Sequence, residues 1–491
     1  MKLHIQYQPD ALPIITCASH PEWVGLYNTA LRLAFSNIEY PDRGDWKPQM
    51  SCMPNSGTIW QWDSCFMALF AKYSNGLLPG VNNLDNLYSL QDEDGYISMA
   101  YRIASGEPAF GQRINPPIYA WVEWENFLLS GDESRLADVL PKLVNYYHWI
   151  KNNRRRESGL YWFEDPGSSG MDNSPRGGYL SSESNGSDIC FVDLACQQAL
   201  GALYIERIAR RLGQTDIADE FYCEYGHLVN LINDYHWCEK AGFYFDLYAR
   251  IPASGHHNYL NQKTVAGFWA ILSGVADERR MNRMLEHLLN PDEFYTLHPV
   301  PSISRDNPNY DPMGRYWLGG VWAPTNYMIT KGLAGRHRYD IARDIAVAHI
   351  SAMSQVLNNK DYASIWECYA PEYMRPATYK TGGDSLSRIA FVGWSGLGPV
   401  AMLIEDVFGL DFNALQNKIT WRICTEGEHG ISNLIFNGQN VSLLCCGDSR
   451  QAGSTKVLVE TSGAINISIS LSNSFGFKDY ALAPGRHEMV V

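Results

Sequence analysis

The sequence predicts a mainly α fold, an (α/α)6 barrel of paired helices with a small C-terminal β-domain. Long amphipathic runs rich in aromatic residues cover positions 22 to 410, and strand-like alternation is scarce among them. After position 411 the pattern changes to short alternating runs. With 45% apolar residues among 491, the chain can bury a large core. We therefore expect a barrel domain over 1–410, the larger of two, and a β-sandwich-like domain over 411–491.

The helical runs come in consecutive pairs, and about a dozen of them is the number that six helix pairs require. A solenoid of helix pairs is the alternative arrangement, but no motif repeats at a fixed period to support it. The expected helices cover residues 22–36, 63–74, 82–90, 118–129, 136–152, 188–212, 215–236, 262–275, 278–290, 320–335, 337–358 and 394–408.

Long loops separate several of these helices. Loops longer than ~15 residues inside a compact domain are usually functional or disordered. These loops are rich in Trp, Tyr, Asp and Gly, so we expect them to be ordered walls of a binding site. They cover residues 37–62, 91–117, 153–187, 291–319 and 359–393.

The segment after Asp411 reads as a series of strands separated by Gly and Asn. We expect this β-domain to cap the barrel, with carbohydrate binding as the alternative role. The expected strands are ITWRICTE, ISNLIF, VSLLCC, TKVLVE, INISISL and HEMVV.

The formal net charge of -14 is spread along the chain, which argues against nucleic acid or an anionic membrane surface as a partner. A neutral or weakly charged ligand fits better. The first twenty residues lack a basic start followed by an apolar run. Eleven cysteines without disulfide-framework spacing suit a reducing compartment. We expect a soluble, cytoplasmic protein whose oligomeric state the sequence leaves open.

Asp172 is the first candidate for chemistry. It lies in GSSGMDNSPR (167–176), a loop of small residues that also carries Arg176. Inverting glycosidases need a carboxylic acid on one side of the scissile oxygen, and this loop would present one with little bulk around it. The alternative is a loop aspartate that caps a turn or pairs with Arg176.

Glu367 is the second candidate. It lies in SIWECYAPE (364–372), between a tryptophan and a tyrosine that would desolvate its carboxylate. A surface loop is the alternative interpretation, and Glu372 competes for the same role.

A third group combines tryptophans with polar residues at junctions between loops and helices. Trp stacks on the apolar face of a pyranose, while Asp, Gln and Asn bind its hydroxyls. Each Trp taken alone fits a core position better than a binding site, and only their recurrence at these junctions favours a sugar site. The segments are IWQWDSCF (59–66), QDEDGY (91–96) and WLGGVWAPTNY (317–327).

Read in this order, the segments from about residue 60 to 410 resemble glycoside hydrolase families 63 and 37. This clan contains processing α-glucosidase I, mannosylglycerate hydrolase and trehalase, and the similarity is strongest to the bacterial mannosylglycerate-hydrolase-like branch. Ser169–Arg176 is similar to the trehalase segment Ser-Gly-Trp-Asp-Phe-Ser-Ser-Arg, which implies that Asp172 is the general acid. Glu367–Pro371 is similar to Glu-x-Tyr-x-Pro, followed by Gly393-Trp394, which implies that Glu367 is the general base.

The resemblance also implies which residues bind or shape the sugar site. One departure is that relatives carry Tyr-Trp-Arg-Gly where this chain has Leu318 in third place, so a polar contact is missing. We expect Arg176 to meet a substrate hydroxyl or carboxylate. The expected substrate-binding residues are Trp60, Trp62, Asp63, Gln91, Arg176, Trp322, Asn326, Tyr369 and Trp394.

The implied activity is that of an inverting, exo-acting hydrolase of a short α-glucoside or related α-glycoside. The acid must stay protonated near neutrality, so we expect the pKa of Asp172 to be raised by burial or by Glu367, with Arg176 opposing that rise if it lies close. We expect no cofactor and no catalytic metal, with Asp306, Asn307 and Asp311 as candidates for a structural calcium.

Two other classes stay open. A sugar epimerase or isomerase on a similar barrel would use histidines as acid and base, and the chain offers His148, His236 and His298 outside the aromatic-rich motifs. A non-catalytic sugar-binding protein of the same fold would lack one carboxyl, whereas both are present here. A polysaccharide lyase would need a Tyr or His base beside an acidic sugar.

Overall fold

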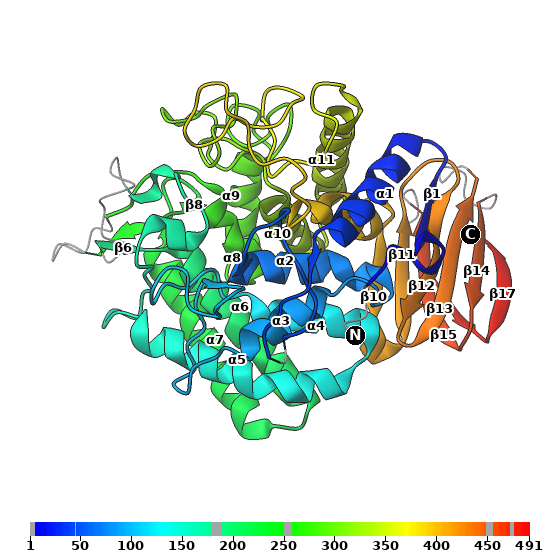
Figure 1. The fold of residues 1–491 in the computed structure, drawn as a ribbon, viewed down its shortest axis with the longest axis horizontal. Coiled ribbons are helices and arrows are strands. Elements are labelled where there is room, and N and C mark those ends of the chain that lie inside the picture. Colours follow the sequence, from blue (N-terminus) through cyan, green and yellow to red (C-terminus); the bar gives the residue numbers. More distant parts are fainter. Residues whose placement is uncertain (1–4, 45, 178–187, 250–257, 448–454, 472–475) are drawn as a thin grey trace.

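The computed structural model describes residues 5–44, 46–177, 188–249, 258–447, 455–471 and 476–491. It is rich in helices with several small sheets, and the strands that follow residue 410 gather at one end of the molecule (Figure 1). Every expected helical segment contains a helix. The predicted helix-rich architecture is therefore confirmed.

The helices of the first half lie within a few residues of their predicted bounds. They are α1 (Pro21–Ser36), α2 (Gln61–Ala71), α3 (Gly80–Tyr88), α4 (Tyr119–Ser130), α5 (Glu133–Asn153), α6 (Val192–Arg211) and α7 (Thr215–Tyr235). Those of the second half are α8 (Trp269–Leu272), α9 (Glu278–Leu288), α10 (Ala323–Ala334), α11 (Tyr339–Asn358), the 3-10 turn η7 (Ser395–Leu397) and the π-helical η8 (Gly398–Val407).

Two helices differ from the expectation. The segment 262–275 forms only the 3-10 turn η6 (Val265–Phe268) and the single turn α8. Gly274, at a φ of +74°, ends this helix early, because the left-handed region favours glycine. The segment 394–408 is π-helical over most of its length rather than α-helical.

A closed ring of helices forms the centre of the molecule. Helix α2 packs on α4, α4 on α6, α6 on α8 and α8 on α10, while η7 contacts both α10 and α2. All residues of α2 are buried, as expected for a helix surrounded by others. Around this ring, α3 packs on α2, α5 and α7 on α6, α11 on α10, and α1 on α11 and η8.

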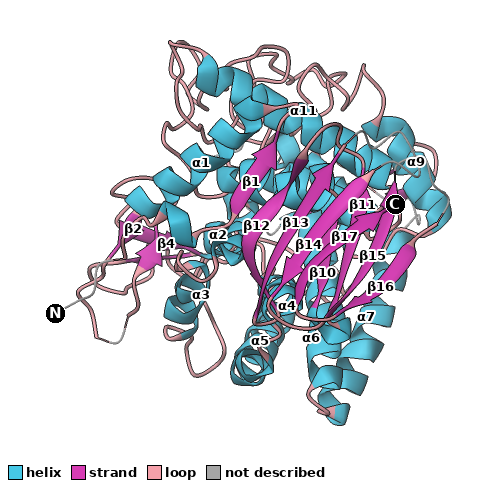
Figure 2. Ribbon diagram, turned by 90° about the vertical axis from the view of Figure 1, so that its right-hand side faces the viewer, coloured by secondary structure: helices cyan, strands magenta, loops and turns pink. Residues whose placement is uncertain are grey.

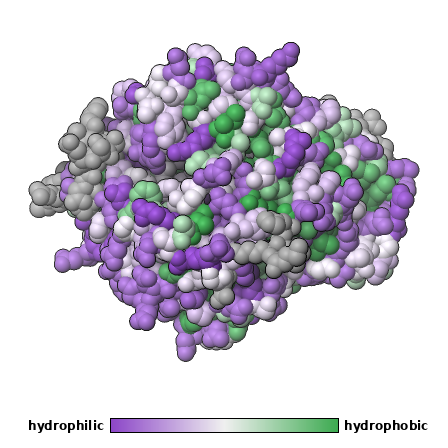
Figure 3. Space-filling model, viewed as in Figure 1, coloured by the Kyte–Doolittle hydropathy of each residue, from purple (hydrophilic) through white to green (hydrophobic). Residues whose placement is uncertain are grey.

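The outer helices bury only one side. In α7 the buried residues are Ala218, Phe221, Leu228 and Ile232, at helical spacing. Hydrophilic side chains accordingly cover much of the helical part on the face seen in Figure 3. Among the described helices, none has the length and apolar character that crossing a membrane requires.

The predicted C-terminal strands all form, and they make two sheets. The strands are β10 (Leu410–Asn413), β11 (Lys418–Ile423), β12 (His429–Phe436), β13 (Gln439–Cys446), β14 (Lys456–Thr461), β15 (Ile465–Leu471), β16 (Lys478–Leu482) and β17 (Gly485–Val490). One sheet has the order β10-β11-β15-β16, with β11 and β15 parallel.

The other sheet, β1-β12-β13-β14-β17, begins with a strand from the opposite end of the chain. Strand β1 (Ile14–Cys17) precedes the first helix and lies antiparallel beside β12, with Ile14 opposite Ser432 (Figure 2). The sequence analysis did not anticipate this strand. The division of the chain at residues 410 and 411 stays a prediction.

Where the ring helices end, near the four-stranded sheet, four side chains form a buried ion cluster. Lys72 Nζ lies 3.4 Å from Glu125 and 3.1 Å from Glu405, and Lys331 Nζ lies 3.0 and 3.1 Å from the same two carboxylates. Lys72 is 5% exposed and the two glutamates are below 10%. Each lysine is thus paired with both glutamates. The four side chains come from the end of α2 (Lys72), from α4 (Glu125), from α10 (Lys331) and from η8 (Glu405).

Lys72→Met should destabilise the fold strongly, because it leaves two buried glutamates with a single lysine. Breaking a buried ion pair by removing one partner costs about 3–5 kcal/mol. Denaturant unfolding followed by circular dichroism measures the loss. Lys456→Met, which removes one partner of the exposed pair with Glu488, is the control and should leave the unfolding midpoint unchanged. Equal, small effects of both substitutions would contradict the interpretation.

Candidate active site

The predicted site residues gather around the N-terminal ends of the ring helices. Trp62 and Asp63 lie in the first turn of α2, directly after the short strand β4 (Thr58–Trp60). Trp322 immediately precedes α10, and Trp394 immediately precedes η7. Helices that surround one centre therefore bring residues from distant parts of the sequence to the same end of the ring.

The loop that carries Asp172 lies directly against α2. Gly170, which ends the 3-10 turn η3 (Pro166–Ser169), has a φ of +80°. A Cβ at this position would lie 2.2 Å from the Trp62 ring, so only glycine fits. Beyond Asp172, Asn173 donates to the Arg315 carbonyl at 2.9 Å and accepts from the Trp317 backbone N–H at 2.9 Å. The loop is thus tied to the 315–317 segment.

Arg176 anchors this loop from beneath. Its guanidinium is fully buried and makes two-pronged hydrogen bonds to Asp193 in the first turn of α6 (2.6 and 2.7 Å) and to Asp246 (both 2.8 Å). The structure therefore does not support the expected contact between Arg176 and the substrate. Its donors are occupied by two carboxylates, and the residue positions the Asp172 loop instead.

Glu367 is held by two donors in a buried position. Its carboxylate is 1% exposed and accepts from the Tyr316 hydroxyl at 2.8 Å and from an Arg388 Nη at 2.6 Å. Burial raises the pKa of Glu367 above its ordinary value, while Arg388 and Tyr316 oppose that rise. The result is a fixed carboxylate that still takes up a proton more readily than an exposed glutamate.

Asp172 is more exposed than its expected role led us to predict. Its side chain is 38% exposed, and Lys380 Nζ lies 3.0 Å from one carboxylate oxygen. Lys380 also lies over the rings of Tyr316 and Tyr379. The structure therefore places Asp172 at a partly exposed position, so that burial, one of the two environments expected for it, is not found. Nothing in the sequence indicated the contact between Asp172 and Lys380.

Asp63 connects the two halves of the site. It is 5% exposed, and burial followed by the charge of Glu367 raises its pKa to about 8, with a smaller contribution from Asp172. The pKa of Tyr316 is likewise raised by burial and by the charges of Glu367 and Asp172. Tyr316 also connects the two carboxyls by contact, because its hydroxyl donates to Glu367 and Lys380, the partner of Asp172, lies over its ring. At neutral pH Asp63 is largely protonated and can donate a hydrogen bond.

Four tryptophans pack together beside these carboxyls. Trp317 and Trp322 are stacked with ring centroids 4.0 Å apart. The centroid of the Trp62 ring lies 6.3 Å from that of Trp317 and 5.6 Å from that of Trp394. The Trp394 centroid in turn lies 5.6 Å from that of Trp322. Trp394 Nε1 also donates to the Glu367 carbonyl at 3.0 Å. These rings form an aromatic wall next to Glu367. Trp60 is partly exposed and meets Phe110 at 5.3 Å.

Three predicted substrate-binding residues have structural contacts instead. The Gln91 amide donates to the backbone carbonyls of Gly95 and Lys142, and Asn326 bonds the backbone of Pro299 and Val300. Tyr369 is buried, and its hydroxyl accepts from the Trp366 N–H at 3.1 Å. These contacts hold loops in place, so we assign the three residues a role in shaping the site.

The three histidines that an epimerase or isomerase would use lie in different environments. His148 lies 3.3 Å from Glu220, His236 is bonded to the Phe245 carbonyl at 2.7 Å, and His298 pairs with His349 at 3.0 Å. Burial lowers the pKa of His298 well below its usual value, so this ring stays neutral. No contact among the described residues brings two of the three candidates together, and the epimerase interpretation loses its support.

The proposed calcium residues do not form a cation site. Asp306 is paired with Lys263 Nζ at 2.7 Å, so its charge is already compensated. Asp311 accepts from the Met313 N–H at 2.8 Å in a local turn. Across the described segments, no three His, Cys, Asp or Glu side chains cluster in a way that would bind a metal ion.

Comparison with known proteins finds relatives over much of the chain. A curated protein of Borreliella burgdorferi, described as uncharacterized, is 28% identical over 433 residues, covering 86% of this chain and 88% of that protein. The mannosylglycerate hydrolase of Thermus thermophilus is 25% identical over 356 residues, covering 56% of this chain and 80% of the enzyme.

The fold is shared with solved structures. A structure described as GH63 mannosylglycerate hydrolase from Thermus thermophilus in complex with glucose superposes with a TM-score of 0.62 at 19% identity, over 77% of this chain and all of that one. Residues 57–378 match the family model described as the mannosylglycerate hydrolase MGH1-like glycoside hydrolase domain. The chain therefore belongs to the MGH1-like family of glycoside hydrolases.

Proposed function

We propose that this protein is an inverting, exo-acting hydrolase of a short α-glycoside, with Asp172 as general acid and Glu367 as general base. The observation that carries the proposal is the connection of the two carboxyls through Tyr316, although Asp172 and Glu367 come from different loops. The Tyr316 hydroxyl donates to Glu367 at 2.8 Å, and Lys380, which lies 3.0 Å from Asp172, is placed over the Tyr316 ring. We further propose that the closed ring and its outer helices constitute an (α/α)6 barrel, whose one end carries this site.

The proposed reaction is a single displacement. Asp172 donates its proton to the glycosidic oxygen as the bond from that oxygen to the anomeric carbon breaks. Glu367 takes a proton from a water molecule as the water oxygen bonds to the anomeric carbon from the opposite face. Tyr316 and Arg388 hold the Glu367 carboxylate in place, and both carboxyls return to their starting states after one proton exchange with solvent.

The contact between Lys380 and Asp172 bears on the leaving group. As general acid, Asp172 must reach the glycosidic oxygen, whereas in the structure one of its carboxylate oxygens lies 3.0 Å from Lys380 Nζ. A leaving group that carries its own carboxylate would attract Lys380 away from Asp172. We therefore place mannosylglycerate and glucosylglycerate ahead of neutral α-gluco-oligosaccharides among the candidate substrates, with the loss of the arginine at Leu318 as a further influence on specificity.

Asp172→Asn and Glu367→Gln should each lower the rate of hydrolysis by about 100- to 10,000-fold, the usual contribution of a general acid or base. Released sugar is measured on mannosylglycerate, glucosylglycerate, maltose, isomaltose and trehalose. Glu372→Gln is the matched control, because this carboxylate instead bonds Tyr310 and Arg305. A Glu372→Gln protein as inactive as Glu367→Gln, or no hydrolysis of any member by the unaltered protein, would contradict the proposal.

The acidic limb of the pH profile should report the raised pKa of Glu367. The base is active only when ionised, so activity is lost as pH falls through this pKa. Arg388→Met removes the positive charge that lowers it, so the acidic limb of kcat/KM should move to higher pH. Arg388→Lys keeps the charge and should move the limb less. A limb that stays in place or moves to lower pH in Arg388→Met would refute the assignment of the base.

A further inference from the structure

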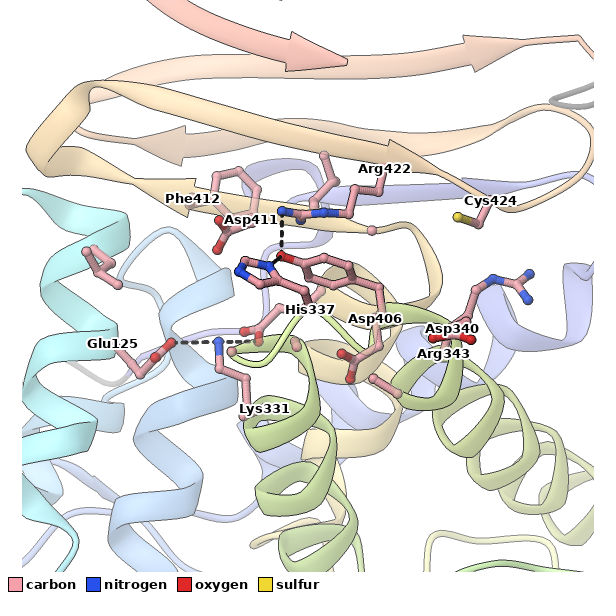
Figure 4. A pocket seen from close by; sticks show the side chains of 18 of the residues that line it. Glu125, Lys331, His337, Asp340, Arg343, Asp406, Asp411, Phe412, Arg422 and Cys424 are labelled. Atoms are coloured by element: carbon pink, nitrogen blue, oxygen red, sulfur yellow. Dashed lines mark hydrogen bonds and ion pairs between the residues drawn. The ribbon is translucent and has the colours of Figure 1, made fainter. Parts of the chain in front are cut away.

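A large cavity lies between the C-terminal ends of the ring helices and the four-stranded sheet. Its volume is about 1020 Å³, at the upper end of the range for small-molecule sites. Figure 4 shows Glu125 and Lys331 rising from α4 and α10 on one side, with Asp411, Phe412 and Arg422 facing them from β10 and β11. Helices and sheet therefore both contribute side chains to one partly open cavity.

This cavity is separate from the active site. Asp63 lies in the first turn of α2, whereas Lys72, which lines the cavity, directly follows the last turn of that helix. Their separation corresponds to about 13 Å along a helix at ~1.5 Å per residue. In the same way Trp322 precedes α10, while Lys331 and Ala334 lie in its last turn. None of the residues assigned to the active site lines the cavity.

The floor of the cavity is the ion cluster of Lys72, Lys331, Glu125 and Glu405. Two lysines and two glutamates compensate each other, so the floor offers fixed polar atoms without net charge. Around it, Asp340, Asp344 and Asp411 are balanced in part by Arg343 and Arg422. A strongly anionic ligand would meet at least as many carboxylates as cations.

Several polar atoms on the cavity wall lack a partner among the described residues. They are Trp121 Nε1, Asp406 Oδ2, and the Nε atoms of Arg343 and Arg422, all buried. The Trp121 side chain itself is 0% exposed. Burial, followed by the charge of Glu405, raises the pKa of Asp406 to about 8, so this carboxyl is mostly neutral at pH 7. Buried polar groups without partners are costly, and a ligand with hydroxyl groups would satisfy both donors and acceptors.

Aromatic rings complete the wall. Tyr339, Phe412 and Phe477 line the cavity, and the Arg422 guanidinium lies over the Tyr339 ring at 3.9 Å. Aromatic faces beside fixed donors and acceptors suit a compound that has apolar C–H faces and many hydroxyls. Such mixed chemistry with little net charge is that of an uncharged sugar.

We propose that this cavity is a second binding site, one that takes a neutral mono- or disaccharide between the ring helices and the β10–β11 strands. A ligand there would lie between Glu125 and Lys331 of the ring helices and Asp411 and Arg422 of the sheet, within reach of polar groups from both. The site does not depend on the catalytic proposal, because binding in the cavity requires neither Asp172 nor Glu367.

Isothermal titration calorimetry with glucose, mannose, maltose and trehalose tests this site in the Asp63→Ala protein, in which binding at the active site is weakened. At least one sugar should still bind. Ala334→Phe and Ser470→Tyr, added separately, fill the cavity from α10 and from β15 and should each weaken that binding by about tenfold or more. Ala481→Phe on the exposed side of β16, outside the cavity, is the control and should leave it unchanged.

If a variant that fills the cavity does not fold, hydrogen–deuterium exchange of the unaltered protein with the same sugars tests the second site independently. Protection of β10 and of the last turn of α10 is expected. Absence of binding by every sugar at millimolar concentration, binding unaffected by both filled variants, or protection confined to the N-terminal ends of the ring helices would overturn the second site. Hydrolytic activity has no part in these outcomes, so they are distinct from a failure of the catalytic proposal.

Discussion

The pairing of Arg176 with Asp193 and Asp246 is the interaction on which the geometry of the site depends. It places one buried cation between two buried carboxylates and thereby joins the Asp172 loop to the first turn of α6. Charges of this kind persist in a protein interior only when every hydrogen-bonding group is used. Because the guanidinium is fully used, the loop above it is held against Trp62 and the 315–317 segment, and Asp172 is presented at its rim.

The same principle separates the two ends of the helical ring. At the N-terminal ends the charges are incompletely compensated: Asp63 and Glu367 are buried close together, and burial keeps the pKa of each above its ordinary value. At the C-terminal ends two lysines and two glutamates compensate each other in the ion cluster. An enzyme that moves protons needs the first arrangement, whereas the second provides stable, preformed polar atoms for packing or binding.

The sequence predicted the helices well, because aromatic and aliphatic residues at helical spacing leave a strong local signal. Of the site residues that it predicted, Trp62, Asp63, Trp322 and Trp394 lie at the N-terminal ends of ring helices, while the catalytic roles of Asp172 and Glu367 stay predictions. It could not predict that β1 pairs with β12, or that Arg176, Gln91 and Asn326 are used within the protein, since each depends on partners far away in the chain. Lys380 and Arg388 were missed for the same reason.

The central claim is that Asp172 and Glu367 act from opposite faces of the sugar in a single displacement. Proton NMR of the first sugar released from an α-glycoside measures its anomeric configuration before mutarotation sets in. The account predicts that the β-anomer appears first. Initial release of the α-anomer would require a covalent intermediate, and would contradict the assignment of Glu367 as a base that activates water.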